Sequence, residues 1–152
     1  MNPDHALLLD FLRSPGGPPR AVDSNPLALA LGTTLIAADA AAGTLTLGFE
    51  PDARFVQGNG AVQGGMVSAM LDFATAFVVL MQLPPERSAV TAALDLQFMR
   101  AARAGRFVAD AKLRRAGATL AFAEAALRRA DEREPCACAS AVLPLLNVTR
   151  SP

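Results

Sequence analysis

The sequence lacks tryptophan and tyrosine and contains only one histidine, His5, among its 152 residues. Without these two aromatic side chains, platforms that stack on nucleic-acid bases are not expected. A single histidine near the N-terminus nearly excludes Ser–His–Asp and Cys–His hydrolases, in which a histidine carries the proton. Net charge is absent as well, because 14 basic residues balance 14 acidic ones, so nothing favours a nucleic acid or an anionic membrane surface as a partner.

Cysteine is scarce too, with Cys136 and Cys138 as the only two in the chain. In a strand they point to the same face and are poorly placed to bond to each other, so we interpret them as small core residues in a reducing compartment. With one distant histidine they make no zinc set, and we expect neither a metal nor a cofactor. The N-terminus has no basic start and carries Asp10 after its apolar stretch, unlike a signal peptide, so the expected location is the cytoplasm.

The length of the chain suits one domain preceded by a short arm. Residues 5–13 have the pattern of a short amphipathic helix, for which Asn2 or Asp4 could provide the cap. The stretch that follows, SPGGPPR at 14–20, is typical of a flexible joint. We therefore expect a helical arm with its joint at residues 1–24 and a single domain over residues 25–152.

Alternation of apolar with other residues predicts strands at 33–39, 43–50, 88–100, 106–115, 119–129 and 135–146. The first two form a hairpin around Gly43. Residues 119–129 would also suit a helix, but we prefer a strand because a turn containing Gly117 follows an alternating strand. The last strand has Pro144 near its end or at an edge.

The longest apolar segment, residues 58–80, reads GNGAVQGGMVSAMLDFATAFVVL and contains one charge, that of Asp72. It predicts a helix over about 65–82, which Pro84 and Pro85 end. A membrane-spanning helix is the alternative, since residues 64–83 reach the ~20 residues that a span needs. A charge near its centre would cost roughly 2.5–3.5 kcal/mol there, so we expect no membrane partner. A helix that is apolar on nearly every side also suits a sheet wrapped around it, in an α+β architecture.

Two features of this helix suggest catalysis. Gly64 and Gly65 open it, where backbone N–H groups lack intrahelical partners, carry partial positive charge and can be approached closely by a carbonyl oxygen. That arrangement would stabilise an oxyanion, although a tightly packed helix start is the simpler interpretation. Asp72 is a candidate general base for water or a nucleophile, and a structural buried carboxylate is the alternative.

The spacing of these two features predicts a dimer. A helix rises about 1.5 Å per residue, which puts Gly64 and Asp72 about 12 Å apart along its axis. One reacting carbon cannot contact both within one chain. Two antiparallel helices related by a two-fold axis would place Gly64 of one subunit opposite Asp72 of the other.

The order of elements and the segment QGNGAVQGGMVSAMLDFATA resemble the hotdog-fold acyl-CoA thioesterases of the PaaI-like, phenylacetate-pathway type, over about residues 27–146. The family pattern is Asn or Gln, a loop Gly, His-Gly-Gly, six residues and then Asp or Glu. The matching positions are Gln57, Gly60, Gln63, Gly64, Gly65 and Asp72. The resemblance implies a hotdog fold, in which a curled antiparallel sheet wraps one long central helix, and hydrolysis of acyl-CoA by a homodimer that is commonly paired into a tetramer.

The chain departs from the family pattern at three positions. Gln63 replaces the usual His, and Gln57 stands where many members have Asn. The family often has a Ser or Thr in the next strand that helps to place water. The position that we match to it is Ala93, with Thr91 and Thr75 as the nearby hydroxyls.

Several other residues are candidates for the site. Gln57 and Gln63 could orient the acyl carbonyl or the water, and Thr75 lies about one helical turn beyond Asp72. Exposed arginines suit the phosphates of coenzyme A, although a solvated face is the simpler interpretation. The arginines and the remaining substrate-binding candidates are Arg100, Arg103, Gly65, Met66 and Phe73, the last two among apolar residues that could line an acyl tunnel or belong to the core.

The function that we expect is therefore hydrolysis of acyl-CoA thioesters, with Asp72 as base or nucleophile and the Gly64 amide as oxyanion donor. Because Gln63 replaces the family histidine, a non-catalytic module that binds acyl-CoA is the alternative. A purely structural interaction domain is a third hypothesis.

Overall fold

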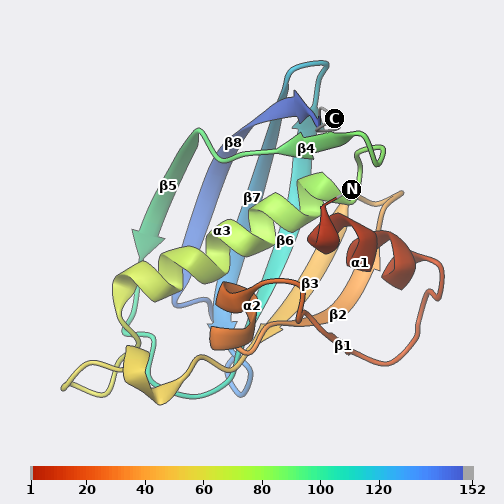
Figure 1. The fold of residues 1–152 in the computed structure, drawn as a ribbon. Helices are drawn as coiled ribbons and strands as arrows, with labels where there is room; N and C mark the ends of the chain where they lie inside the picture. The colour runs from red at the N-terminus through yellow and green to blue at the C-terminus, as the bar shows by residue number, and fades with distance from the viewer. Residues whose placement is uncertain (1, 149–152) are drawn as a thin grey trace.

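The computed structural model describes residues 2–148, so the outermost ends of the predicted arm and domain, residues 1 and 149–152, lie outside the described residues. One antiparallel sheet of eight strands curls around a long helix, α3 (Gly64–Leu80), without closing into a barrel (Figure 1). The predicted α+β architecture, with a curled sheet wrapped around one central helix, is confirmed.

The other helices are α1 (Pro3–Leu12), α2 (Pro26–Ala30) and the single 3₁₀ turn η1 (Ala53–Phe55). The strands are β1 (Arg20–Ala21), β2 (Thr34–Asp39), β3 (Thr44–Phe49), β4 (Arg87–Ala89), β5 (Ala93–Phe98), β6 (Phe107–Ala116), β7 (Leu120–Arg129) and β8 (Ala137–Asn147). Their order in the sheet is β1-β2-β3-β6-β7-β8-β4, and β5 also pairs with β8. The preference for a strand over residues 119–129 is confirmed, since β7 occupies that stretch.

The prediction of one continuous strand over residues 88–100 is wrong, because β4 and β5 are separate strands that both pair with β8. Pro144 of β8 faces the interruption at residues 90–92. Proline has no N–H, so it cannot donate to the ladder. The Val90 N–H still donates to the Pro144 carbonyl at 3.1 Å, but regular pairing stops and Thr91 lies in the gap.

The inner face of the sheet explains how α3 is buried. On β6, β7 and β8 the positions that face the helix are mostly small and nearly inaccessible: Ala109, Ala111, Ala123, Ala125, Ala139 and Ala141. Because alanine is short, the helix lies close against the sheet, and its own large side chains fill the space between. No helix within residues 2–148 is both long and apolar enough to cross a membrane.

The N-terminal segment packs against this core. Asn2 caps α1 by accepting the Asp4 N–H at 2.9 Å, as predicted for one of the two candidates. Leu8 is fully buried, and so is His5, whose Nε2 lies 3.0 Å from the Leu83 carbonyl oxygen just beyond α3. Helix α1 therefore lies beside the C-terminal end of α3 (Figure 1).

Both cysteines have free thiols. Cys136 is a buried core residue, as predicted, and its thiol donates to the Leu127 carbonyl. Burial raises the pKa of the Cys136 thiol, so it stays protonated and unreactive. The interpretation as a core residue is wrong for Cys138, which is half-buried on β8 and lies on the outer face of the sheet, away from α3.

Candidate active site

The start of α3 is capped by Gln63. Its side-chain Oε1 accepts the Met66 N–H at 3.2 Å, and its own N–H donates to the Phe55 carbonyl at 2.8 Å. The side chain that we expected to orient substrate thus has a local structural role in this chain. A glutamine can provide this cap because its amide oxygen reaches back over the first turn.

The two glycines of this turn differ in what they make room for. A Cβ on Gly65 would lie 2.7 Å from Gln63 Oε1, so the glycine lets the capping side chain fold over the helix start. A Cβ on Gly64 would meet only the ring of Phe98 at 3.7 Å, an ordinary contact. Packing within the chain does not require a glycine at position 64, and the bare backbone there is open to a group from outside the chain.

A hollow of about 430 Å³ lies beside Gly64. It brings Gln57, on the loop before the helix, together with Arg100, which follows β5. The loop is held in place by the Gln57 N–H, which donates to the Ala61 carbonyl at 2.8 Å. Arg103 is not in the lining, and the Ala61–Arg103 bridge instead joins its backbone to this loop.

Asp72 lies in the middle of α3 and is half-buried. Its Oδ1 accepts a hydrogen bond of 2.7 Å from the Thr91 hydroxyl. From the sequence, we matched Ala93 to the position where the family often has a Ser or Thr that helps to place water. Thr91 was named only as a nearby hydroxyl. Thr91 could have been identified only from the position of Pro144, which faces the interruption between β4 and β5. That position depends on strand pairing, which sequence periodicity does not reveal.

A second, smaller hollow of about 250 Å³ adjoins Asp72. Its floor is a stripe of α3, comprising Phe73, Ala76, Phe77 and Leu80. The rings of Phe73 and Phe77 pack against each other in a tilted arrangement, with 5.5 Å between centroids and 60° between ring planes. Phe73 is thus placed beside the carboxylate, as the acyl-tunnel hypothesis requires.

Five predicted site residues line neither hollow: Gln63, Gly65, Met66, Thr75 and Arg103. Thr75 is fully buried, and its hydroxyl donates to the backbone carbonyls of Leu71 and Asp72, each at 3.1 Å. It therefore contacts the backbone of the candidate base rather than its carboxylate. Met66 is half-buried and packs against the core from the first turn of α3.

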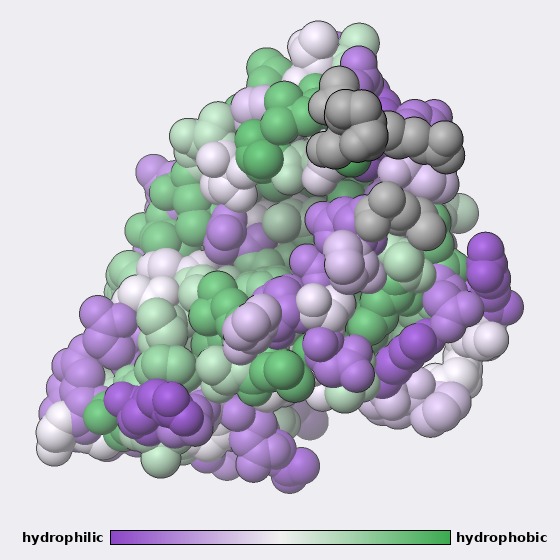
Figure 2. Space-filling view, viewed as in Figure 1, coloured by the Kyte–Doolittle hydropathy of each residue, from purple (hydrophilic) through white to green (hydrophobic). Residues whose placement is uncertain are grey.

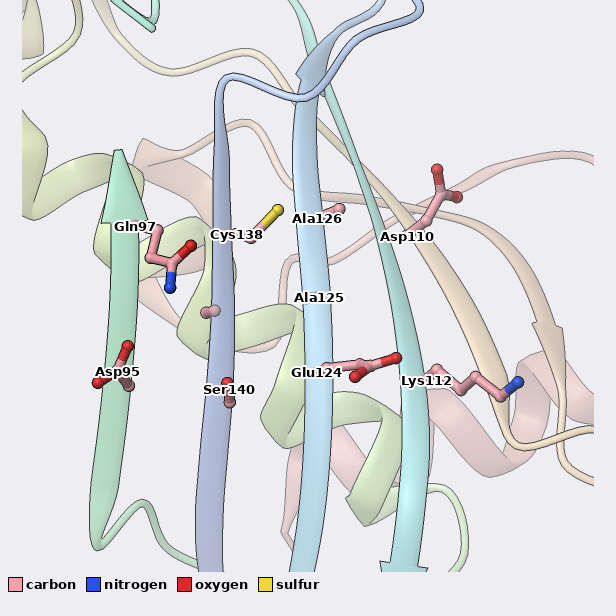
Figure 3. A pocket seen from close by; sticks show the side chains of 10 residues that line it. Asp95, Gln97, Asp110, Lys112, Glu124, Ala125, Ala126, Cys138 and Ser140 are labelled. Carbon is pink, nitrogen blue, oxygen red and sulfur yellow. The ribbon is translucent and has the colours of Figure 1, made fainter. Parts of the chain in front are cut away.

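A third hollow, of about 330 Å³, lies on the outer face of the sheet, away from α3 (Figure 3). Two of the three acidic residues in its lining, Asp110 and Glu124, already have partners. Asp110 accepts from Thr46 at 2.8 Å, and Glu124 pairs with Arg114 at 3.3 Å. Figure 3 shows Glu124 directed toward the strand that carries Lys112. Exposed, paired charges of this kind suit a solvated sheet face better than a reaction centre.

The two hollows along α3 do not merge in the single chain. Their lining residues are disjoint, and Gly64 and Asp72 are separated by about 12 Å of helical rise. Strand β5 pairs only with β8, so its other edge is unpaired in the described chain. Exposed apolar side chains flank that edge, namely Val90, Phe98 and Met99, and apolar surface gathers on the β5 side of the molecule (Figure 2).

Comparison with known proteins finds similarity to thioesterases, both in a family model and in solved structures. The model of the thioesterase superfamily matches residues 59–136. A crystal structure from Ralstonia eutropha, described as a thioesterase candidate related to phenylacetic acid degradation, is 31% identical, with a TM-score of 0.77 over 90% of this chain and 98% of that one. No curated protein matches the sequence.

More distant structures share the fold. A thioesterase family protein from Silicibacter pomeroyi is 24% identical, with a TM-score of 0.76 over 94% of this chain and 98% of that one. The PaaI protein from the phenylacetic acid degradation operon of E. coli is 18% identical, with a TM-score of 0.75 over 96% of each chain.

Proposed function

This chain belongs to the thioesterase superfamily and is a PaaI-like thioester hydrolase with the hotdog fold, and from that premise we propose that it hydrolyses acyl-CoA at a site built by two subunits. The release of a carboxylate and a thiol needs three elements: a group that activates water, a donor for the oxyanion, and a place for each arm of the thioester. The two hollows along α3 offer these elements separately.

Asp72 is the residue that we assign to water activation. The Thr91 hydroxyl holds Oδ1, which leaves Oδ2 to take the proton as water attacks the thioester carbon. The same oxygen could instead attack directly and form a mixed anhydride, which water then hydrolyses. In either case the carbonyl oxygen gains negative charge, and the thiolate of coenzyme A leaves when the tetrahedral intermediate collapses.

The Gly64 amide is the oxyanion donor that we propose. It lies in the first helical turn, where the N–H points away from any intrahelical acceptor and the helix dipole favours negative charge. Gln57 lines the same hollow and can donate a second hydrogen bond to the acyl carbonyl. Arg100, also in that lining, suits a phosphate of coenzyme A.

The observation that carries this proposal is the separation of the two hollows, together with the unpaired edge of β5. A second copy that pairs its β5 with this edge would extend the sheet and cover the exposed apolar residues. The two-fold axis would then bring the Gly64 hollow of one subunit to the Asp72 hollow of the other. We therefore propose a homodimer, which can pair again into a tetramer.

The activity is tested by measuring free-thiol release from short, medium, long-chain and aromatic acyl-CoAs. Wild type is compared with Asp72→Asn and with Asp95→Asn, a matched control on the outer face of β5. Turnover that collapses only in Asp72→Asn supports the assignment. If wild type releases no thiol but is stabilised thermally by acyl-CoA, the non-catalytic binding module replaces it.

The shared site is tested by subunit mixing. Asp72→Asn and Gly64→Val are each expected to be inactive, but a dimer with one subunit of each kind retains one site with both native residues. Random mixing should restore about a quarter of the wild-type activity if each site draws on both subunits. Mixtures that remain as inactive as the parents would contradict a site built from Gly64 and Asp72 of different subunits.

A further inference from the structure

The hollow beside Asp72 has a wall that does not belong to the central helix or the sheet. Opposite the stripe of α3, the lining is completed by Asn2, Asp4 and Leu27 from the N-terminal segment. These residues come from the cap and first turn of α1 and from the first turn of α2. Asn2 and Asp4, which the sequence assigned to an arm, thus border the candidate base together with Leu27 from the start of the predicted domain.

This wall is held firmly. Asp4 Oδ1 accepts hydrogen bonds from the Ser24 hydroxyl and from Asn25 Nδ2, the latter at 2.9 Å. Asn25 in turn caps α2 by accepting the Ala28 N–H at 2.8 Å. The starts of α1 and α2 are therefore tied together through one carboxylate, and Leu27 occupies a fixed position relative to both.

Both helices are also anchored to the core. Helix α1 is held by buried Leu8 and by the contact of His5 with the Leu83 carbonyl. Helix α2 is held by Ala28 and Leu31, which are fully buried. A wall anchored at both ends limits what fits against α3, because enlarging the hollow would require these contacts to break.

Leu27 itself is unusual within this wall. It leaves 44% of its surface exposed although it is apolar, and that surface lines the hollow. With Phe73, Phe77 and Leu80 opposite, the space is apolar at its sides. Its volume of about 250 Å³ lies below the range of roughly 300–1,000 Å³ typical of sites for drug-sized ligands. Such a volume suits a small or compact group.

We propose that the N-terminal segment determines acyl specificity: Leu27 limits the size of the acyl group, and Asp4 disfavours acyl groups that end in a carboxylate. The inference rests on the proposed function, which places the acyl group of the substrate in the hollow beside Asp72. The substrate class that follows is short or compact uncharged acyl-CoA. An anionic acyl end would face the carboxylates of Asp4 and Asp72 in a confined, partly apolar space, where like charges repel strongly.

The first test compares Leu27→Ala with Leu29→Ala. Leu29 lies on the same short helix and is 60% exposed, but it does not line the hollow, so it is a matched control. We expect Leu27→Ala to raise the ratio of kcat/KM for octanoyl-CoA over butanoyl-CoA by about tenfold, the scale on which pockets discriminate a few methylenes. Leu29→Ala should leave the ratio unchanged. An unchanged ratio in Leu27→Ala, or an equal change in both variants, would overturn the proposal.

The second test concerns charge. Glutaryl-CoA and pentanoyl-CoA have equally long acyl chains, and only the first ends in a carboxylate. Asp4→Asn should raise kcat/KM for glutaryl-CoA relative to pentanoyl-CoA, whereas Asp10→Asn, on the exposed end of the same helix, should not. An Asp4→Asn protein that is folded by circular dichroism and keeps the wild-type ratio would remove the role of Asp4.

Failure of this inference is distinguishable from failure of the proposed function. If wild type hydrolyses acyl-CoA but the ratios do not respond, only the role of the N-terminal segment is lost. If wild type hydrolyses no acyl-CoA, the same ratios are measured as dissociation constants by calorimetry. A ratio of affinities that shifts in Leu27→Ala but not in Leu29→Ala then supports the segment as the wall of a binding pocket, and an unchanged ratio overturns it.

Discussion

The two halves of α3 border hollows of opposite chemical character. The hollow at the N-terminal half is the larger and offers hydrogen-bond donors and a cation: the Gly64 backbone, Gln57 and Arg100. The hollow along the rest of the helix is smaller and offers two carboxylates, those of Asp72 and Asp4, beside the apolar side chains of α3 and Leu27. Each half lacks groups that the other has, and for this reason we propose that thioester hydrolysis at this site needs two copies of the helix.

The largest effect on activity is expected from removing the carboxylate of Asp72. Asp72→Asn keeps the shape of the side chain but cannot take a proton or attack carbon, so kcat should fall about 10²- to 10⁴-fold. KM should change little, because the acyl hollow is preserved. The measurement is steady-state thiol release beside Asp95→Asn, and a comparable loss in that control would show that the wrong carboxylate was chosen.

Blocking the Gly64 amide, the proposed oxyanion donor, should have the next largest effect on activity. A side chain at position 64 would cover the amide, and loss of an oxyanion donor costs about 10²-fold or more in kcat. Gly64→Val should therefore lose activity while its melting temperature stays close to wild type, since its nearest neighbour is the Phe98 ring at 3.7 Å from the Cβ position.

The adjacent glycine provides the contrast for that variant. Gly65→Ala would displace the capping side chain of Gln63, which should lower the free energy of unfolding by about 1 kcal/mol. Thermal denaturation and thiol release are measured on both variants. If Gly64→Val were the less stable and the more active of the two, the roles assigned to these glycines would be reversed.

A smaller effect on activity is expected from removing the hydrogen bond between Thr91 and Asp72. Thr91→Val removes the hydroxyl that holds Asp72 Oδ1, and kcat should fall roughly tenfold because a hydrogen bond to a charged group is lost in an accessible position. Thr75→Val is the control, since that hydroxyl bonds only backbone carbonyls of α3. We expect Thr75→Val to change stability with little change in kcat, and the reverse pattern would assign the water-placing role to Thr75.

The smallest expected effect concerns the wall of the acyl hollow. Burial lowers the pKa of His5, because the charged imidazole is poorly solvated there. The folded arm therefore binds a proton less readily than the free arm, so its docking is fully stable above the ordinary pKa of about 6.5 and weakens as pH falls toward the lowered value. Cleavage by trypsin at the joint of residues 14–20 should accelerate over that range.

His5→Gln is the variant that isolates this effect. Glutamine can still donate to the Leu83 carbonyl but does not titrate. The cleavage rate of the variant should lose the pH dependence seen in wild type, after correction for the pH profile of trypsin on an unfolded substrate. Identical profiles for the two proteins would exclude His5 as the cause.

The sequence was sufficient for most of the fold because its strands alternate regularly and its one long apolar segment carries a single charge. It was insufficient where one element acts on another. The interruption between β4 and β5 depends on Pro144, more than 50 positions away, and it is this interruption that puts Thr91 beside Asp72. The wall around Leu27 likewise depends on how α1 and α2 are tied together through Asp4, which no local periodicity reveals.

The glutamine at position 63 teaches a related lesson. From the sequence it was a departure from the family pattern and a reason to doubt catalysis. In the structure its side chain caps helix α3, a role that the residue type alone does not disclose. Contact between Gln63 and substrate stays a prediction. The Gly65→Ala variant bears on it, because the added methyl group would displace the Gln63 side chain.

The buried alanines of β6, β7 and β8 that face α3 limit how this enzyme can change during evolution. Enlarging any of them would lift the helix from the sheet and displace Gly64 and Asp72 together, so the chemistry resists change from that side. The N-terminal segment meets the same helix from outside through side chains such as Leu27, which can change size one at a time. The role that we propose for Leu27 therefore implies that single substitutions at the starts of α1 and α2 would change the substrate range and leave the reaction itself intact.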